Sequence, residues 1–131
     1  MAAALRPGLI GEALLIVTED HTARAIGSGT VRALGTPEMI CLMEQASVAA
    51  VASHLPAGQS TVGYYLEVRH VAPTPVGLQV RARAELIAVD GSKLTFQVEA
   101  FDEREKIGAG THRRSIIEAA AFQGRADSKA G

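Results

Sequence analysis

One segment of this chain would be apolar on almost every side as a helix, and this constrains the fold more than any other feature. Residues 37–54 (PEMICLMEQASVAAVASH) predict a single long helix. Thr36 is a natural N-cap, Pro37 suits the first helical position, and Glu38 suits the positive end of the helix dipole. Pro56 then ends the helix. A helix with so little polar surface must be buried, so we expect the rest of the chain to wrap around it.

Most of the remaining chain consists of segments in which apolar and polar residues alternate. Such alternation predicts antiparallel strands with one covered face, and Asp90-Gly91 is a strong hairpin signal. The segment from Glu19 to Gly35 contains three glycines and predicts a loop with at most a short turn of helix. The expected strands are residues 9–17, 61–70, 78–89, 93–101 and 106–118.

The order of these elements predicts the fold class. One strand, a loop, a long helix and four more strands form an α+β chain in which a curved antiparallel sheet wraps around one long central helix. This is the hot-dog fold, and we predict it for residues 1–131 as a single domain, with fraying tails at 1–8 and 123–131. A second copy commonly pairs with the free edges of such a sheet, so we expect a homodimer or a tetramer.

Composition limits the partners and the compartment. With 13 Lys and Arg against 14 Asp and Glu, the net charge is −1, which argues against nucleic acid or an anionic membrane as the main partner. No apolar stretch approaches the roughly 20 residues of a membrane span, and the N-terminus lacks the basic region of a signal peptide. The single Cys41 cannot form an internal disulfide. We therefore expect a cytoplasmic protein without a membrane or nucleic-acid partner.

Glu44 is the residue of the predicted helix that most needs an explanation. Apolar residues precede and follow it, and only Gln45 beside it is polar. The two residues could mark one solvated stripe of the helix. A carboxylate removed from water would instead need a partner or a raised pKa, which makes Glu44 a candidate general base or nucleophile.

Thr36 is a second candidate because of its place at the helix start. Besides capping the helix, it lies where free N–H groups and the helix dipole favour a developing oxyanion. Thr36 precedes Glu44 by eight residues, roughly 12 Å along the helix axis. Because helical side chains lean toward the N-terminus, the remaining gap would suit a carbonyl group and a water.

Three basic residues on strands are weaker candidates. His70 ends a predicted strand beside a proline-rich segment, where it could transfer a proton or simply be exposed. His112 and Arg114 share one face of the last predicted strand and could contact an anionic ligand. The basic run His112-Arg113-Arg114 also fits a face of the strand that is exposed to solvent.

Other site types find no support in the sequence. It contains no Cys/His pair at metal-binding spacing, no HExxH and no GxSxG. Gly108-Ala109-Gly110 lies within a predicted strand and therefore does not open a helix as a dinucleotide loop does. The chain has no Trp and few aromatic residues on which bases could stack. We expect neither a metal nor a bound cofactor.

Three segments resemble hot-dog thioesterases related to fluoroacetyl-CoA thioesterase. The first is residues 36–44 (TPEMICLME), and the last is residues 107–114 (IGAGTHRR). Between them, Gly63 is followed by His70 and then by the run 74–77 (TPVG). Together these segments extend the resemblance over most of residues 9–118.

The resemblance implies an acyl-CoA thioesterase with a catalytic set of Thr36, Glu44 and His70. It also implies that Gly63 and Arg114 bind substrate and that coenzyme A enters only as part of the substrate. Seven positions separate Gly63 from His70, which places them on opposite faces of a regular strand. We therefore expect a bulge between them, or His70 just beyond the strand.

The segment before Thr36 departs from the family pattern. In the fluoroacetyl enzymes this segment is longer and carries phenylalanines that form a lid over the acyl pocket. Residues 23–35 of this chain contain no aromatic residue, which favours a small or general acyl group over fluoroacetyl selectivity.

Several mechanisms and one rival function remain open at this point. Glu44 would act as the nucleophile or as the base for a water, or Thr36 would be the nucleophile activated through His70. The rival is a non-catalytic hot-dog module that binds an acyl thioester or another small apolar ligand. A hot-dog hydratase would need a different acid–base pair, for which Asp20-His21 is a poor substitute.

Overall fold

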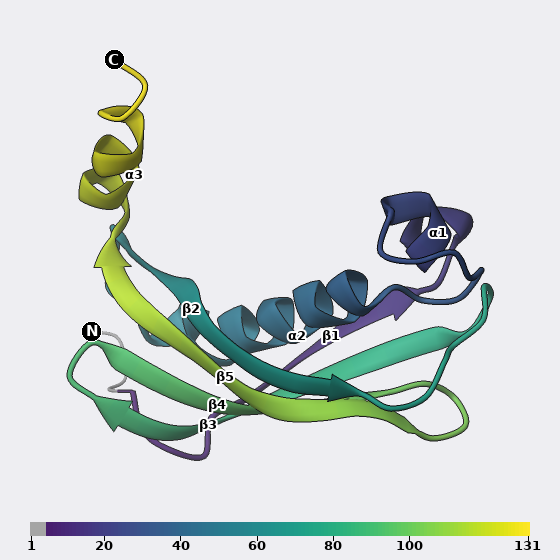
Figure 1. Ribbon diagram of the computed structural model, residues 1–131. Coiled ribbons are helices and arrows are strands. Elements are labelled where there is room, and N and C mark those ends of the chain that lie inside the picture. Colours follow the sequence, from purple (N-terminus) through teal and green to yellow (C-terminus); the bar gives the residue numbers. More distant parts are fainter. Residues whose placement is uncertain (1–4) are drawn as a thin grey trace.

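The computed structural model describes residues 5–131 as one sheet, one long helix, one shorter C-terminal helix and several short turns (Figure 1). In chain order the elements are β1 (Ile10–Ile16), a 3₁₀ turn (Glu19–His21), α1 (Ala23–Ile26), α2 (Thr36–Val51), a second 3₁₀ turn (Ala52–His54), β2 (Gln59–His70), β3 (Gln79–Asp90), β4 (Lys93–Phe101), β5 (Lys106–Glu118) and α3 (Ala119–Asp127). Residues 1–4 of the predicted N-terminal tail lie outside the described residues.

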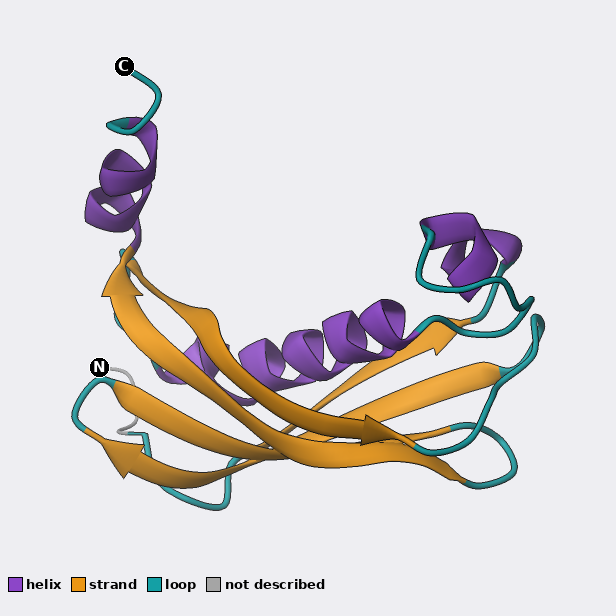
Figure 2. Ribbon diagram, in the orientation of Figure 1, coloured by secondary structure: helices purple, strands orange, loops and turns teal. Residues whose placement is uncertain are grey.

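The five strands form one sheet in the order β1-β3-β4-β5-β2, and every neighbouring pair is antiparallel. The sheet curls, and α2 lies along its concave face (Figure 2). This confirms the predicted α+β hot-dog arrangement. The strand order leaves β1 and β2 as the two edges of the sheet.

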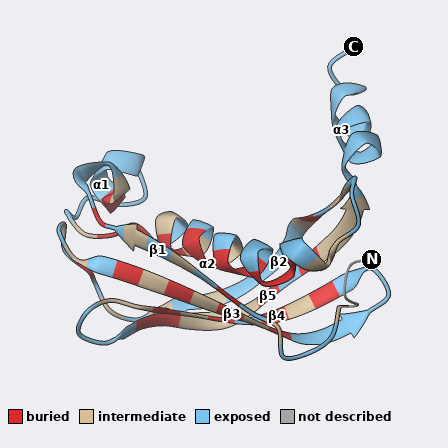
Figure 3. Cartoon of the chain, turned by 180° about the vertical axis from the view of Figure 1, so that it is seen from behind, coloured by how far each residue is buried: buried red, intermediate tan, exposed pale blue. Residues whose placement is uncertain are grey.

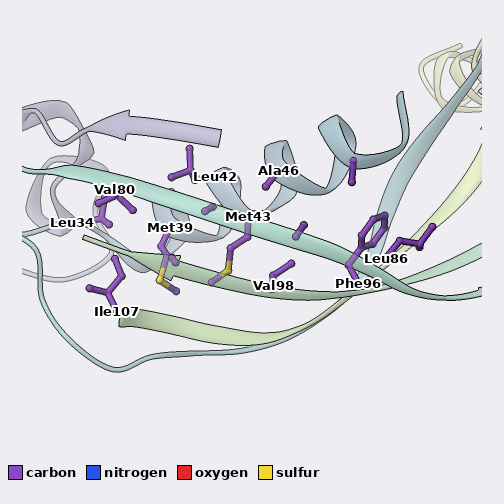
Figure 4. Close-up of a cluster of buried hydrophobic side chains, with 14 of the residues drawn as sticks. Leu34, Met39, Leu42, Met43, Ala46, Val80, Leu86, Phe96, Val98 and Ile107 are labelled. Atoms are coloured by element: carbon purple, nitrogen blue, oxygen red, sulfur yellow. The ribbon is translucent and has the colours of Figure 1, made fainter. Parts of the chain in front are cut away.

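The core lies between α2 and the inner face of the sheet (Figures 3 and 4). It includes fully buried side chains from both layers, such as Met43 of α2 and Phe96 of β4. At Gly11 of β1 the helix comes so close that an added Cβ would collide with the backbone of Ala46 and Ala50. These alanines therefore serve close packing of helix and sheet.

The chain itself covers only one side of α2. Six residues of the helix are exposed: Thr36 and Pro37 at its start, and Cys41, Gln45, Val48 and Ala49 farther along it. The expectation that this helix is buried on almost every side is therefore wrong for a single chain, although the predicted sheet and central helix are confirmed. The reason is that the five strands curl against α2 but end at two free edges before they surround it.

Two local predictions differ from the structure. Thr36 is the first residue of α2 rather than its N-cap, a position that Gly35 occupies. The sequence predicts that residues 123–131 fray, but the helix α3 occupies Ala119–Asp127 and projects away from the end of β5 (Figure 1). Three alanines at its start favour helix even though none of its residues is buried.

Candidate active site

Thr36 and His70 meet at the N-terminal end of α2. Thr36 opens the helix, His70 is the last residue of β2, and Thr36 Oγ1 lies 2.8 Å from His70 Nδ1. The other ring nitrogen of His70, Nε2, is buried and has no hydrogen-bond partner within residues 5–131. A hydroxyl against one imidazole nitrogen, with the other nitrogen unused, is an arrangement that can activate the hydroxyl as a nucleophile.

The surroundings of His70 keep its imidazole neutral near pH 7. Burial lowers the pKa of His70, and the backbone of Ala72 offsets this only in part. A neutral imidazole can accept the proton of Thr36 or of a water. The position of the pair at the start of α2 also places it near the positive end of the helix dipole. Pro37 has no N–H, and the N–H groups of Glu38 and Met39 donate to the Gly35 carbonyl.

A cavity of about 430 Å³ opens beside this pair. One wall is the segment of residues 28–36 that leads into α2, and the other is residues 70–73 after β2. Its lining includes Val31, Leu34 and Pro73 but no Asp, Glu, Lys or Arg. The cavity is therefore suited to an uncharged, largely apolar group next to the Thr36 hydroxyl.

Glu44 and Arg114 form a second polar cluster farther along α2. The Arg114 side chain is only 8% exposed, and its Nη1 lies 3.3 Å from Glu44 Oε2, whose side chain is 38% exposed. Arg114 also donates from Nε to the Thr61 hydroxyl at 2.8 Å and from Nη2 to the Thr61 carbonyl at 2.9 Å. Burial lowers the pKa of Arg114, and the charge of Glu44 opposes that shift.

Gly63 provides the space in which this second cluster lies. A Cβ at this position would lie 2.9 Å from both Glu44 Oε2 and His112 Cε1, and 3.3 Å from Arg114 Nη1. The pairing of β2 with β5 shifts by one residue between Gly63 and Tyr65, so the predicted bulge is confirmed. Because of this bulge, Gly63 and His70 both face the helix side of the sheet.

The solvated-face interpretation of His112 and Arg114 is wrong, since both side chains are buried. His112 Nδ1 lies 2.9 Å from the Tyr65 carbonyl, and its Nε2 lies 3.1 Å from Arg114 Nη1. In the sequence, the burial of these two residues is hard to recognise because exposed Arg113 lies between them in one basic run. The signal was the alternation along β5, which places His112 and Arg114 on the face shared with buried Gly108.

The structure thus divides the predicted site residues into two groups. It brings Thr36 to His70, and it brings Glu44 to Gly63 and Arg114. Within residues 5–131, no hydrogen bond or ion pair links Glu44 to either member of the first pair. One chain therefore carries two separate half-sites along α2.

No group of three or more His, Cys, Asp or Glu residues among positions 5–131 could hold a metal ion. None of the helices described there is long and apolar enough to cross a membrane.

Comparison with known proteins identifies the family. The family model of fluoroacetyl-CoA-specific thioesterases matches residues 17–120, which is most of the chain. The chain belongs to this family of hot-dog thioesterases. The fluoroacetyl-CoA thioesterase of Streptantibioticus cattleyicolor is 41% identical to this family member over 91 residues, which cover 70% of this chain and 66% of that relative.

Solved structures agree with this assignment. The fluoroacetyl-CoA thioesterase FlK matches at a TM-score of 0.91 and 32% identity, covering 97% of this chain and 98% of its own. A thioesterase superfamily member from Thermus thermophilus matches at a TM-score of 0.86 and 27% identity, over 94% of this chain and 91% of its own. A hot-dog-like protein from Thermanaerovibrio acidaminovorans is 21% identical to this family member, and this match supports only the fold.

Proposed function

We propose that this chain hydrolyses an acyl-CoA thioester to the free acid and coenzyme A. The observation that carries the proposal is the Thr36–His70 contact of 2.8 Å at the start of α2, beside a cavity free of Asp, Glu, Lys and Arg. In this reaction the acyl–sulfur bond breaks, water supplies a hydroxyl group to the acyl carbon, and the sulfur receives a proton. Neither a metal nor a bound cofactor has a part in these steps.

The geometry favours a role for Thr36 in the acyl transfer. The thioester carbonyl would lie at the start of α2, where the positive end of the helix dipole stabilises negative charge on its oxygen. His70 would accept the Thr36 proton at Nδ1 and later return a proton to the sulfur. Alternatively, Glu44 would attack directly or act as the base for a water, as the sequence also allows.

We propose a homodimer as the form that unites the two half-sites. The β2 strand is a sheet edge, and the side of α2 next to it is uncovered. Suppose two β2 strands pair antiparallel about a centre between Leu66 and Glu67. Gly63 of one protomer, and the Glu44 that contacts it, then lie opposite the partner's His70. Such a dimer would place one carboxylate beside each Thr36–His70 pair.

The cavity and the nearby charges suggest how the substrate is held. The absence of Asp, Glu, Lys and Arg from the cavity lining supports a small or general uncharged acyl group. Arg114 is buried against Glu44 and Thr61, so we propose that it binds on the acyl side and not at the CoA phosphates. Arg69, exposed beside His70, is the cation placed to meet those phosphates. A cytoplasmic location fits this substrate and the free, exposed Cys41.

The experiment that tests the function measures thiol release from short, branched, long and aromatic acyl-CoA esters. It compares the wild type with Glu44→Gln, which keeps the shape of the side chain and removes its charge. We expect turnover of some esters by the wild type and a loss of orders of magnitude in the variant. If a folded wild type releases thiol from none of the esters, the rival function, a non-catalytic module that binds an acyl thioester or a small apolar ligand, becomes the better interpretation.

A further inference from the structure

His112 is a fully buried polar residue to which the proposed reaction assigns no role. It lies on the inner face of β5, stacked on Phe96 with ring centroids 6.3 Å apart. Its Nδ1 lies 2.9 Å from the Tyr65 carbonyl oxygen, at the β2 bulge. Its Nε2 lies 3.1 Å from Nη1 of Arg114. Both ring nitrogens are therefore engaged, one by the backbone and one by a guanidinium.

These two partners determine where the His112 proton lies. A carbonyl oxygen only accepts hydrogen bonds, and a guanidinium only donates them. Nδ1 must therefore carry the proton that goes to Tyr65, and Nε2 must be the lone-pair acceptor for Arg114. The ring is neutral in this arrangement. Burial lowers the pKa of His112, and the charge of Arg114 acts in the same direction.

The same contacts restrain the guanidinium of Arg114. Its Nε and Nη2 donate to Thr61, and its Nη1 is shared between His112 Nε2 and Glu44 Oε2. Without an acceptor at His112 Nε2, Arg114 Nη1 would lose the shorter of its two contacts. The guanidinium would then lose one of its restraints. The chain of contacts thus runs from the bulge at Tyr65 through His112 and Arg114 to the carboxylate of Glu44.

We propose that His112 is a positioning residue for thioester hydrolysis, because its neutral ring accepts from Arg114 and holds the guanidinium against Glu44. This inference rests on the proposed function. Protonation at Nε2 would remove the acceptor and place a second positive charge next to Arg114. The charged groups that face His112 are Arg114 on β5 and Glu44 on α2. The arrangement therefore fails as the pH falls through the His112 pKa.

Two substitutions separate the two contacts of the ring. In His112→Gln the side-chain oxygen reaches the Nε2 position and can still accept from Arg114, but the donor to Tyr65 is lost. In His112→Asn the amide nitrogen takes the Nδ1 position and can still donate to Tyr65, but the acceptor for Arg114 is lost. Each variant loses one hydrogen bond, so we expect similar thermal unfolding midpoints for the two.

Their activities should differ even though their stabilities do not. We expect kcat of His112→Asn to fall by about 10- to 100-fold, as losing a charge-assisted hydrogen bond predicts, with KM little changed. The kcat of His112→Gln should stay within roughly fivefold of the wild-type value. Its pH–activity profile should lose the part of the acid limb that protonation of His112 causes. Equal kcat in the two variants, or kcat that follows their unfolding midpoints, would overturn the inference.

A measurement on the wild type tests the inference without any activity assay. Nitrogen-15 NMR of the histidine rings at pH 7 should show His112 neutral, with its proton on Nδ1. A proton on Nε2, or a doubly protonated ring, would contradict the proposed contacts. An inactive wild type with the expected tautomer would reject the proposed function, whereas an active wild type with equal variants would reject only the role of His112.

Discussion

The Thr36 hydroxyl and the Nδ1 atom of His70 lie 2.8 Å apart, although 34 positions separate them in the chain. The contact joins the start of α2 to the end of β2, two elements that the core holds in place. The hydroxyl is therefore positioned by the fold and not by helix capping. Its chemistry can be altered with little effect on helix stability.

Removal of the Thr36 hydroxyl should abolish most of the activity and leave the fold intact. We expect Thr36→Ala to lower kcat by about 100-fold or more, while Thr36→Ser, which keeps the hydroxyl, stays within roughly tenfold of the wild type. Thiol release and circular dichroism of both variants check this. Full activity in a folded Thr36→Ala would show that Thr36 is not the nucleophile and would favour Glu44.

The pH dependence should follow the neutral form of His70. Burial lowers the pKa of this ring below its ordinary value of 6.5, so the active neutral form persists into more acidic solution. We expect kcat/KM to be level near pH 7 and to fall only as the pH drops through a pKa below 6.5. The profile of His70→Asn should lack the part of this limb that His70 causes, and a limb centred above 6.5 would count against His70 as the base.

Gly63→Ala should damage the second half-site. The added Cβ would lie 2.9 Å from both Glu44 Oε2 and His112 Cε1, so one of these groups must move. Overpacking of this kind costs about 1–3 kcal/mol of unfolding free energy, and we expect a fall in turnover of about 10-fold or more. The matched control is Gly124→Ala, where nothing lies within 4 Å, and this variant should keep both activity and stability.

Mixed dimers test whether the two half-sites come from different protomers. Thr36→Ala and Glu44→Gln should each be nearly inactive as homodimers. If each site combines the Thr36–His70 pair of one protomer with the partner's Glu44, a mixed dimer of the two variants regains one intact site of its two. Such a dimer should show about half of wild-type turnover.

Two controls accompany the mixing experiment. Light scattering should give a dimer for the wild type and for both variants. If folded mixed dimers stay as inactive as their parents, the site belongs to a single protomer, and the proposed β2 register is wrong.

Periodicity in the sequence determined the secondary structure and the fold class. Alternation along five segments predicted the strands, and two of them, β4 and β5, begin and end at the predicted residues. This works because the alternation directly records which strand face is buried. The apolar run of residues 37–54 predicted one helix, and the structure divides this segment into α2, which ends at Val51, and the 3₁₀ turn Ala52–His54.

The sequence also pointed to Thr36, Glu44 and His70 but not to their grouping. Local signals, such as a helix start or a strand end, identify residues whose surroundings are unusual. Whether two such residues touch depends on contacts between elements distant in the chain. For this reason the structure alone decided that Thr36 contacts His70 while Glu44 contacts Arg114.

Which residues of the basic run His112-Arg113-Arg114 on β5 are buried was also decided only by the tertiary structure. In the sequence, all three residues of this run are polar and nothing local distinguishes them. In the structure, the pleat of β5 turns His112 and Arg114 toward the core and Arg113 toward solvent. Burial of a guanidinium is tolerable there only because Thr61, His112 and Glu44 supply its partners. Local sequence thus determined which strands and helix form, whereas packing between them decided which polar groups leave water together.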